Sequence, residues 1–242
     1  MPADHFGEDV AARYDEWLPE MFDPAVVEPA VDLIAELAGD GAALELGIGT
    51  GRIALPLAAR GVAVHGIDLS EAMVAQLRAK PGGDRIPVVL GDFATTRVDG
   101  VFTVVYLVFN TINNLTTQDE QVACFQNVAD HLTPGGCFLI EVGVPNLQRL
   151  PPGETIRAFD ISATHLGFDE YDVVSQGLIS HHYYAVGDTF ELRSMPFRYV
   201  WPAELDLMAQ LAGMRLQGRW GGWEHEPFTG ESRKHVSVWV KS

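Results

Sequence analysis

The sequence of 242 residues has few cysteines, few lysines and no long apolar run. Its two cysteines, Cys124 and Cys137, stand in apolar surroundings, so we expect buried free thiols with neither a disulfide nor a metal pair. No stretch approaches the roughly 20 apolar residues that a membrane helix needs. Residues 1–17 contain acids where a secretory signal has a basic and then an apolar run. These absences predict a cytoplasmic protein without a membrane partner.

Positive charge is also scarce, since 16 basic residues stand against 33 acidic ones and the formal net charge is −17. An acidic surface repels phosphate backbones, which argues against a nucleic acid partner. Hydrophobic residues make up 47% of the chain and charged residues 20%, the balance of an ordered globular protein. At this length the chain can bury a large core, and we expect a monomer or a homodimer.

Glycine, in contrast, is concentrated after the first predicted strand. A buried strand at 43–46 leads into Glu45-x-Gly47-x-Gly49-x-Gly51, and an apolar helix follows. Glycines let the backbone take positive φ and let a ligand approach without meeting a Cβ atom, while a helix start offers unpaired N–H groups. Dinucleotide sites use the different spacing G-x-G-x-x-G. The stretch therefore predicts a small-molecule cradle of another type.

This pattern resembles motif I of the class I S-adenosylmethionine (SAM)-dependent methyltransferases, in which an acidic residue precedes three alternating glycines. The resemblance implies SAM as the cofactor. It also implies that Glu45, Gly47, Gly49 and Gly51 hold its methionine part through backbone contacts. Arg52 follows the last glycine and is expected to meet the methionine carboxylate, unless it is a solvated arginine at a helix start.

Two further predicted strand ends carry acids. The second strand ends at Asp68, where a carboxylate can accept hydrogen bonds from both hydroxyls of a ribose, and Leu69 is expected in the same site. Such an acid fits SAM and NAD equally. After the third strand comes Asp92-Phe93, and the resemblance implies that Asp92 accepts from the adenine amine while Phe93 lies against the ring. The alternative is a turn acid beside a core phenylalanine.

The fourth predicted strand, 101–108, ends where a methyl acceptor should meet the sulfonium group. We expect Val108 to contact SAM, and Asn110 and Asn114 in the polar run after it to contact the acceptor. The segment resembles that of glycine and sugar-amine N-methyltransferases, which often have a histidine in the place of Asn114. Asparagine cannot act as a general base, so Asn114 can orient a substrate but not deprotonate it. Alternatively, the asparagines only cap and turn the chain.

An aromatic segment near the N-terminus is the next candidate. The small-molecule methyltransferases that this chain resembles place such a segment over the bound cofactor, often with a Tyr-Asp pair, and Tyr14-Asp15 fits that description. Tyr14 is therefore predicted to cover the cofactor and to belong to the catalytic site. The alternative places it against the following helix beside Trp17.

Beyond the fifth predicted strand the alternation of strands and helices stops. The chain shows strand-like runs at 156–161, 171–185 and 189–200, and residues 186–188 join the last two as a hairpin. We interpret this region as an antiparallel subdomain. By resemblance, it forms a lid or a substrate wall.

His182 and Tyr184 are expected on one face of this subdomain, because alternate residues of a strand point the same way. A histidine near its usual pKa can take the proton that Asn114 cannot, so His182 is the candidate base. Adjacent histidines on a strand diverge and no acid or cysteine stands at ligand spacing, so no metal site is predicted. The alternative is a stacked aromatic surface.

Together these features predict an α/β fold with a Rossmann-like, seven-stranded, mostly parallel sheet covered by helices and an antiparallel β insertion after the fifth strand. The expected boundaries are 1–150 for the N-terminal helices and the SAM-binding core, 151–200 for the lid, and 201–242 for the C-terminal helix and closing strands.

The predicted function is transfer of a methyl group from SAM to an amine or hydroxyl of a small molecule, as in secondary metabolism. An NAD-dependent oxidoreductase is the competing enzyme class, although the glycine spacing is wrong for it and no Tyr-x-x-x-Lys pair occurs. A non-catalytic SAM-binding domain is the other alternative, since no obvious base stands beside the acceptor.

Overall fold

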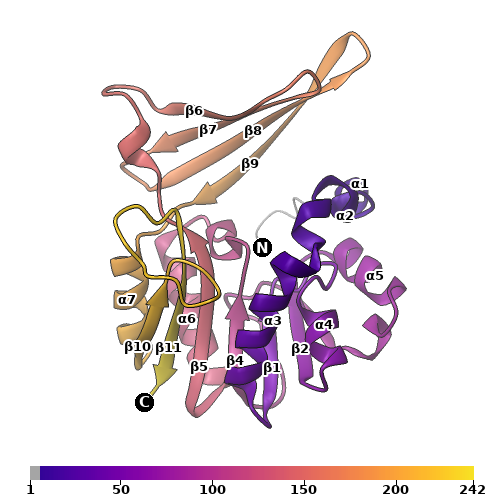
Figure 1. Cartoon of the computed structure of the whole chain (residues 1–242), viewed down its shortest axis with the longest axis vertical. Coiled ribbons are helices and arrows are strands. Elements are labelled where there is room, and N and C mark those ends of the chain that lie inside the picture. The colour runs from indigo at the N-terminus through magenta and orange to yellow at the C-terminus, as the bar shows by residue number, and fades with distance from the viewer. Residues whose placement is uncertain (1–5) are drawn as a thin grey trace.

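The computed structural model describes residues 6–242, which form two β-sheets and a set of helices (Figure 1). Residues 1–5, at the start of the segment inspected for a secretory signal, lie outside the described residues. In chain order the elements are α1 (Glu8–Ala11), α2 (Tyr14–Trp17), η1 (Pro19–Phe22), α3 (Pro24–Ala38), β1 (Ala42–Leu46), α4 (Ala54–Ala59), β2 (Ala63–Asp68), α5 (Glu71–Ala79), η2 (Gly83–Arg85), β3 (Val88–Leu90), β4 (Phe102–Leu107), η3 (Thr111–Asn114), α6 (Gln118–His131), β5 (Leu132–Gly143), η4 (Leu147–Arg149), β6 (Ile156–Ile161), β7 (His165–Asp172), β8 (Gly177–Val186), β9 (Thr189–Arg198), α7 (Pro202–Leu211), β10 (Met214–Trp220) and β11 (Lys234–Lys241).

The larger sheet has the strand order β10-β11-β5-β4-β1-β2-β3. β1 pairs in parallel with β2 and β4, and β3 and β5 extend the parallel set on either side. β11 runs antiparallel to both β5 and β10. The predicted seven-stranded, mostly parallel sheet is therefore confirmed. Its order reverses between β1 and β4, and in such sheets a ligand binds at that point, beyond the carboxyl ends of the strands.

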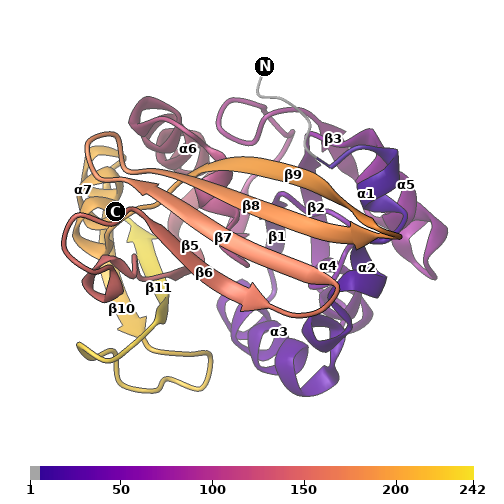
Figure 2. The same ribbon diagram turned by 90° about the horizontal axis from the view of Figure 1, so that it is seen from above.

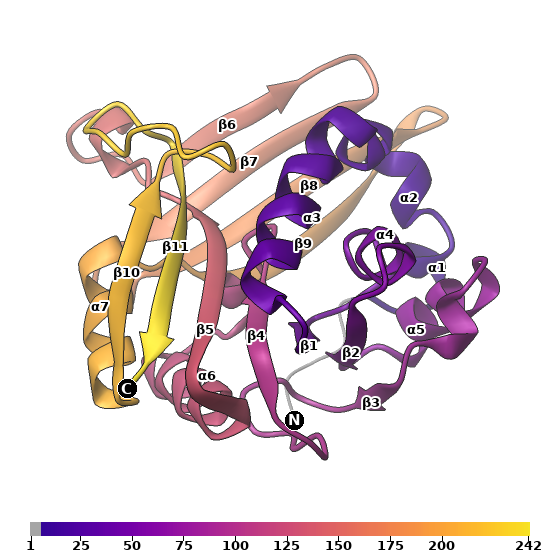
Figure 3. The same ribbon diagram turned by 60° about the horizontal axis from the view of Figure 1, so that its bottom comes forward.

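Helices cover both faces of this sheet and bury two apolar cores. On one face Val31 of α3, Leu57 of α4 and Leu77 of α5 are buried against the strands, and Figure 3 shows α3 and α4 lying across that face. On the other face Phe125 of α6 and Met208 of α7 are buried. β4 is covered on both sides, which explains its nearly unbroken apolar sequence.

Capping residues start the helices that follow β2 and β4. Ser70 Oγ accepts a hydrogen bond from Met73 N at 3.3 Å in the first turn of α5. Thr117 and Glu120 form a reciprocal capping box at the start of α6. Each cap satisfies backbone N–H groups that the helix leaves unpaired. The loops after the two strands are thereby held at the same edge of the sheet.

The smaller sheet follows β5 in the chain, has the order β6-β7-β8-β9 and is antiparallel throughout. Figures 1 and 2 show it lying above the edge of the large sheet at which β1 and β4 end. β8 and β9 join in the predicted hairpin at residues 187–188. The predicted antiparallel insertion after the fifth strand is thus confirmed, and we call this four-stranded sheet the lid.

The lid has four strands where the sequence predicts three strand-like runs. β7 begins at His165, and a turn between β7 and β8 interrupts the predicted run 171–185. In this turn Asp172 Oδ1 accepts a hydrogen bond from Val174 N at 3.0 Å, and Val174 is 91% exposed. Valine has a high strand propensity, but the aspartate-based turn decides the conformation here.

Cys124 and Cys137 are buried free thiols, as predicted. Burial raises the pKa of both thiols, so they stay protonated and unreactive at neutral pH. Among residues 6–242, no helix combines the length and the apolar sequence that crossing a membrane requires.

Candidate active site

A cavity of about 310 Å³ lies beyond the carboxyl ends of β1, β2 and β4. Small-molecule sites are typically about 300–1,000 Å³. Three predicted site residues, Gly51, Asn110 and His182, lie outside the cavity lining. The predicted residues that line it are Tyr14, Glu45, Gly47, Gly49, Arg52, Asp68, Leu69, Asp92, Phe93, Val108 and Asn114.

The glycine-rich turn after β1 approaches its neighbours too closely for side chains. Gly47 has a φ of +68°, and a Cβ atom on it would lie 2.7 Å from Cγ2 of Thr111, in the turn after β4. Glycine is therefore needed at position 47 both for the backbone conformation and for the contact between the two turns. Gly51 has a φ of +83°, and the Leu77 side chain of α5 occupies the place of its Cβ atom. This packing accounts for Gly51 without a contact to the cavity.

Asp68, at the end of β2, is only 8% exposed and holds the glycine turn in place. Its Oδ2 accepts a hydrogen bond from Gly49 N at 2.6 Å, and its Oδ1 accepts one from Ser70 N at 2.8 Å. A carboxylate offers about four lone-pair positions, and these two backbone donors use one on each oxygen. The carboxylate therefore joins the turn to the start of α5 and borders the cavity at the same time.

Glu45, the acidic residue of the glycine motif, is buried in β1. The Tyr106 hydroxyl of β4 donates to its Oε2 at 2.9 Å. Burial raises the pKa of the Glu45 carboxyl to about 8, although the Tyr106 hydroxyl and Arg52 act in the opposite direction. The carboxyl is therefore mostly protonated at neutral pH. A cation bound nearby favours the charged form and lowers this pKa.

The turn after β3 brings Asp92 and Phe93 to the cavity. Asp92 Oδ1 accepts a hydrogen bond from Ala94 N at 2.9 Å, which fixes the carboxylate in a local turn. The Phe93 carbonyl accepts from Asn127 Nδ2 of α6 at 2.9 Å, and its side chain is buried. The pair is thus a turn acid and a core phenylalanine that also border the cavity.

The N-terminal segment forms one side of the cavity. Tyr14 of α2 lines it together with Phe6, and the two rings meet edge to face at 6.2 Å. Burial raises the pKa of the Tyr14 phenol. Asp15 accepts a hydrogen bond from Thr50 Oγ1 at 2.7 Å and forms an ion pair with Lys80. These contacts tie the segment to the glycine turn and to the end of α5.

Arg52 lies in the lining between the glycine turn and the turn after β4. Its Nη1 donates to the Met21 carbonyl at 3.4 Å, and its guanidinium lies 5.3 Å from the centre of the Phe109 ring. Such a cation–π contact contributes about 0.5–1 kcal/mol at an exposed site. A guanidinium binds carboxylates well, so a contact between Arg52 and the methionine carboxylate stays a prediction.

Two consecutive residues after β4, Phe109 and Asn110, adopt left-handed conformations with φ of +57° and +61°. Glu141 of β5 holds both, because its Oε2 accepts from Phe109 N at 3.1 Å and its carbonyl accepts from Asn110 N at 3.2 Å. Asn110 Oδ1 accepts from Gly143 N at 2.6 Å. The Asn110 side chain is therefore part of the turn, whereas Asn114 lines the cavity.

His182 lies in β8, and alternation along the strand puts Tyr184 on the same face. His182 Nδ1 lies 3.0 Å from His165 Nε2, and its Nε2 lies 3.2 Å from Ser180 Oγ. Burial lowers the pKa of the His182 imidazole, and the neighbouring His165 and His181 lower it further. The ring is therefore neutral at pH 7. Because it does not line the cavity, its role as the base stays a prediction.

The lid meets the N-terminal segment at Trp17, one helical turn after Tyr14. Trp17 and Tyr184 stack with ring centres 6.0 Å apart and an interplanar angle of 18°. The guanidinium of Arg193 in β9 lies 5.4 Å from the centre of the Trp17 ring. α2 therefore presents one aromatic residue to the cavity and another to the lid.

Most of the lining residues that the sequence did not predict are close neighbours of predicted ones, so wider motifs would have included them. Pro196 differs, because it comes from the lid and no local pattern marks it. The unpredicted lining residues are Phe6, Ile48, Thr50, Ser70, Met73, Phe109, Thr111, Leu115, Thr116, Glu120 and Pro196. Within the described part of the chain, no group of three or more His, Cys, Asp or Glu side chains is arranged to hold a metal ion.

Known proteins share both the sequence and the fold of this chain. A family profile described as a methyltransferase domain matches residues 43–136, from β1 into β5. The cypemycin N-terminal methyltransferase of a Streptomyces species is 30% identical over 240 residues, which is 93% of this chain and 96% of that one. The structure of the CcbJ methyltransferase from Streptomyces caelestis has a TM-score of 0.86 and 38% identity, and covers 98% of both chains.

A third relative shows how widely the fold is shared. SAM-bound CalS10 is an amino pentose methyltransferase from Micromonospora echinaspora involved in calicheamicin biosynthesis. Its structure has a TM-score of 0.67 and 23% identity, and the match covers 89% of this chain and 90% of that one.

Proposed function

The chain belongs to the class I SAM-dependent methyltransferases, and on that premise we propose that it methylates an amine nitrogen of a small molecule or a peptide N-terminus. The choice of an amine rests on the cavity wall that we assign to the acceptor. There the turn after β4 presents Thr111 and Asn114, and no described histidine lines the cavity. A hydroxyl and an amide can orient a nucleophile but cannot take its proton. A neutral amine brings its own lone pair, whereas a hydroxyl must lose a proton to react.

The cavity residues fit SAM as the methyl donor. SAM carries a sulfonium, an ammonium and a carboxylate, and the lining holds the carboxyls of Glu45, Asp68 and Asp92 and the guanidinium of Arg52. Gly47 lets the turn after β1 lie against Thr111, so that both turns line the cavity. We assign the ribose hydroxyls to Asp68, the adenine to Asp92 and the methionine carboxylate to Arg52.

When bound, SAM would supply a methyl group on a positively charged sulfur for in-line transfer, in which the N–CH3 bond would form as the S–CH3 bond breaks and S-adenosylhomocysteine leaves. The protein contributes alignment and the exclusion of water. Asn114 orients the nitrogen, and Tyr14 closes the cavity on the side of the N-terminal segment. For an acceptor that arrives as an ammonium ion, His182 of the lid takes the proton, and the net charge of −17 favours its approach.

The peptide N-terminus is included for two reasons. The cypemycin relative is named for an N-terminus, and its match spans nearly the whole of both chains. An α-amino group also has a pKa of about 7.7–8.0, so a substantial fraction is neutral at physiological pH. Such an amine makes the smallest demand on a base.

The test has a cofactor step and an acceptor step. Thermal unfolding with SAM, S-adenosylhomocysteine (SAH) or NAD identifies the cofactor, because a ligand at 100 times its dissociation constant stabilises the fold by about 2.7 kcal/mol. We expect shifts with SAM and SAH and none with NAD. The acceptor step incubates the protein and SAM with matched trios: a peptide with a free N-terminus, its N-acetyl form and its α-hydroxy analogue, and likewise an amino sugar, its N-acetyl form and the neutral sugar.

Mass spectrometry of each mixture decides the proposal. We expect one added methyl group on a free amine and none on the acetylated or hydroxyl analogue. Methylation of the hydroxyl analogue would contradict the proposed amine acceptor and would show that the enzyme methylates oxygen. Binding of SAH without methylation of any compound would instead support the non-catalytic SAM-binding alternative.

A further inference from the structure

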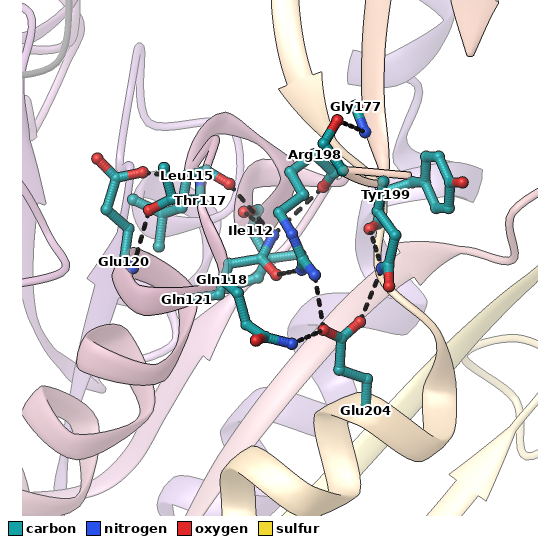
Figure 4. A network of polar contacts seen from close by, with 12 residues as sticks. Ile112, Leu115, Thr117, Gln118, Glu120, Gln121, Gly177, Arg198, Tyr199 and Glu204 are labelled. Atoms are coloured by element: carbon teal, nitrogen blue, oxygen red, sulfur yellow. Dashed lines mark hydrogen bonds and ion pairs between the residues drawn. The ribbon is translucent and has the colours of Figure 1, made fainter. Parts of the chain in front are cut away.

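A buried polar cluster stands where the last lid strand returns to the core. Arg198, the final residue of β9, is 4% exposed, and Gln121 of α6 is fully buried. The Arg198 guanidinium donates through Nη1 to Gln121 Oε1 and through Nη2 to Glu204 Oε1 of α7, the latter at 2.7 Å (Figure 4). Gln118 and Gln176 also donate to the Glu204 carboxylate. The cluster joins the lid to two helices of the core.

Gln121 is the centre of this cluster. Its Nε2 lies 3.3 Å from the Ile112 carbonyl, 3.2 Å from the Leu115 carbonyl and 3.2 Å from the Arg198 carbonyl (Figure 4). The first two carbonyls belong to the turn after β4, and the third ends the lid strand. One buried amide therefore binds two segments that are far apart in sequence.

Both segments contribute to the wall of the cavity. Thr111, Asn114 and Leu115 come from the turn, and Pro196 comes from β9, two residues before Arg198. The turn begins with left-handed residues and has only a short 3-10 helix, so regular secondary structure does little to hold it. The Gln121 amide adds hydrogen bonds that tie the turn to the core helix α6.

A cluster of this kind is not needed for stability alone. Buried ionic groups lose their hydration, and well-packed apolar side chains of similar volume often stabilise a fold equally well. What a fully hydrogen-bonded cluster adds is a single arrangement of the segments that it joins. Methyl transfer depends on such alignment, because small displacements of the acceptor cost large factors in rate.

We propose that Gln121, oriented by Arg198 and Glu204, is a positioning residue that holds the turn after β4 and the lid strand in the one arrangement that aligns the acceptor with the methyl group. This proposal rests on the proposed function only in taking the aligned groups to be a methyl acceptor and the methyl group of SAM. The seating of the lid on the cavity wall can be tested without an acceptor.

Hydrogen exchange followed by mass spectrometry provides this test, with Gln121→Met and the matched control Gln118→Met. The two glutamines lie on the same helix and in the same cluster, but Gln118 is exposed and its amide donates to Glu204, not to the turn or to the lid strand. In Gln121→Met we expect peptides from 109–116 and 177–198 to exchange at least about 10-fold faster, with peptides from 42–68 unchanged. Gln118→Met should exchange like the parent. Equal acceleration of all peptides would show general destabilisation and overturn the proposal.

Calorimetric titration with SAH gives the second readout. The contacts assigned to SAM come mainly from the loops after β1, β2 and β3, so SAH affinity should stay within about 3-fold in Gln121→Met. Loss of SAH binding there, with binding by the parent, would mean that Gln121 acts on the cofactor side and would overturn the proposal. Failure of the parent to bind SAH would instead contradict the proposed function.

Glu204→Gln serves if Gln121→Met does not fold, because it leaves the Gln121 amide in place and removes the charge that orients Arg198. The same two exchange regions should respond, by a smaller factor. With an amine acceptor identified, Gln121→Met should lower kcat at least about 10-fold while KM for SAM stays within 3-fold. Unchanged exchange in both variants, or unchanged kcat, would show that the cluster does not position the wall.

Discussion

The part of the cavity wall assigned to SAM, here called the cofactor side, and the lid are built by different kinds of contact. On the cofactor side, carboxylates bind backbone N–H groups, as Asp68 does at Gly49, and a glycine lets two turns meet, as Gly47 does beside Thr111. On the lid, side chains bind side chains, as His182 does with His165. The cofactor side contains buried carboxyl groups, those of Glu45 and Asp68, whereas much of the lid is half-buried or exposed.

The residues of the cofactor side are constrained by the fold, whereas the exposed side chains of the lid are free to follow the substrate. Changing a backbone cradle alters the glycine turn and the packing around it, so the cradle accompanies the fold. Side chains on an exposed sheet can change without moving the strands. We therefore expect methyltransferases of this fold to share the cofactor side and to differ in their lids.

Gly47→Val should break the cofactor side most severely. The left-handed φ costs about 1–2 kcal/mol for a residue with a Cβ atom, and the contact with Thr111 adds about 1–3 kcal/mol of overpacking. We expect SAH affinity, measured by calorimetry, to fall at least about 100-fold. Gly187→Val in the lid hairpin is the control, because its φ is +61° and its Cβ atom would meet nothing within 4 Å. A similar loss of SAH affinity in that control would contradict the comparison.

In contrast to Gly47→Val, the variant His182→Gln should slow methyl transfer and leave the affinity for SAH unchanged. General bases typically contribute about 100-fold or more, so we expect about that loss in kcat with an ammonium acceptor. His181→Gln is the matched control, since its side chain lies on the other face of β8 beside Ser194. If the two variants turn over equally fast, His182 is not the base and the acceptor side must be assigned elsewhere.

Asp68→Asn tests how much the Asp68 carboxylate contributes to the affinity of the cofactor side for SAH. A hydrogen bond to a charged group contributes about 1.5–3 kcal/mol, so SAH affinity should fall roughly 10- to 100-fold. Asp172→Asn offers the comparison in the lid, where a carboxylate also accepts from a backbone N–H. Calorimetry should show unchanged SAH affinity for this second variant, and an equal loss would mean that the effect is not local.

Glu45→Gln tests the buried carboxyl group of β1 through the pH dependence of unfolding. The folded carboxyl has a pKa of about 8 against 4.5 normally, so between these values the folded state holds a proton that the unfolded state has lost. The free energy of unfolding should therefore fall as pH rises through this window, by up to about 1.4 kcal/mol per pH unit. Urea titrations of Glu45→Gln should lack this slope.

Asp169 in the lid allows the same experiment, because burial also raises the pKa of its carboxyl group. Water reaches the lid more easily, so Asp169→Asn should remove a smaller part of the slope than Glu45→Gln. An equal or larger part would show that the lid is as dry as the core.

The fold was predictable to the level of a seven-stranded, mostly parallel sheet with an antiparallel insertion, because its signals are local. The alternation of strands and helices, with the glycine motif at its start, indicates a parallel sheet before any contact is known. The lid was less accurately predicted. Val174 has the residue type of a strand, yet a hydrogen bond to Asp172 places it in a turn.

The candidate site divides in the same way. Each predicted cofactor contact except Gly51 lines the cavity, since every one lies at the end of a strand or in the loop after it, at the same sheet edge. Asn110 does not, because its side chain bonds to Gly143 of β5, a partner that no local pattern reveals. Pro196 and the Gln121 cluster were missed because they depend on where the lid strand returns to the core.

The sequence by itself determined that this chain builds a SAM cradle, because a strand, a glycine turn and a helix lie within a few consecutive residues. Only the tertiary structure decided which side chains form the cavity wall that we assign to the acceptor. That wall is assembled from the turn after β4 and from β9, which are separated by the whole of α6, β5 and most of the lid. Their contact through Gln121 is a property of three-dimensional packing, and no periodicity or spacing along the chain encodes it.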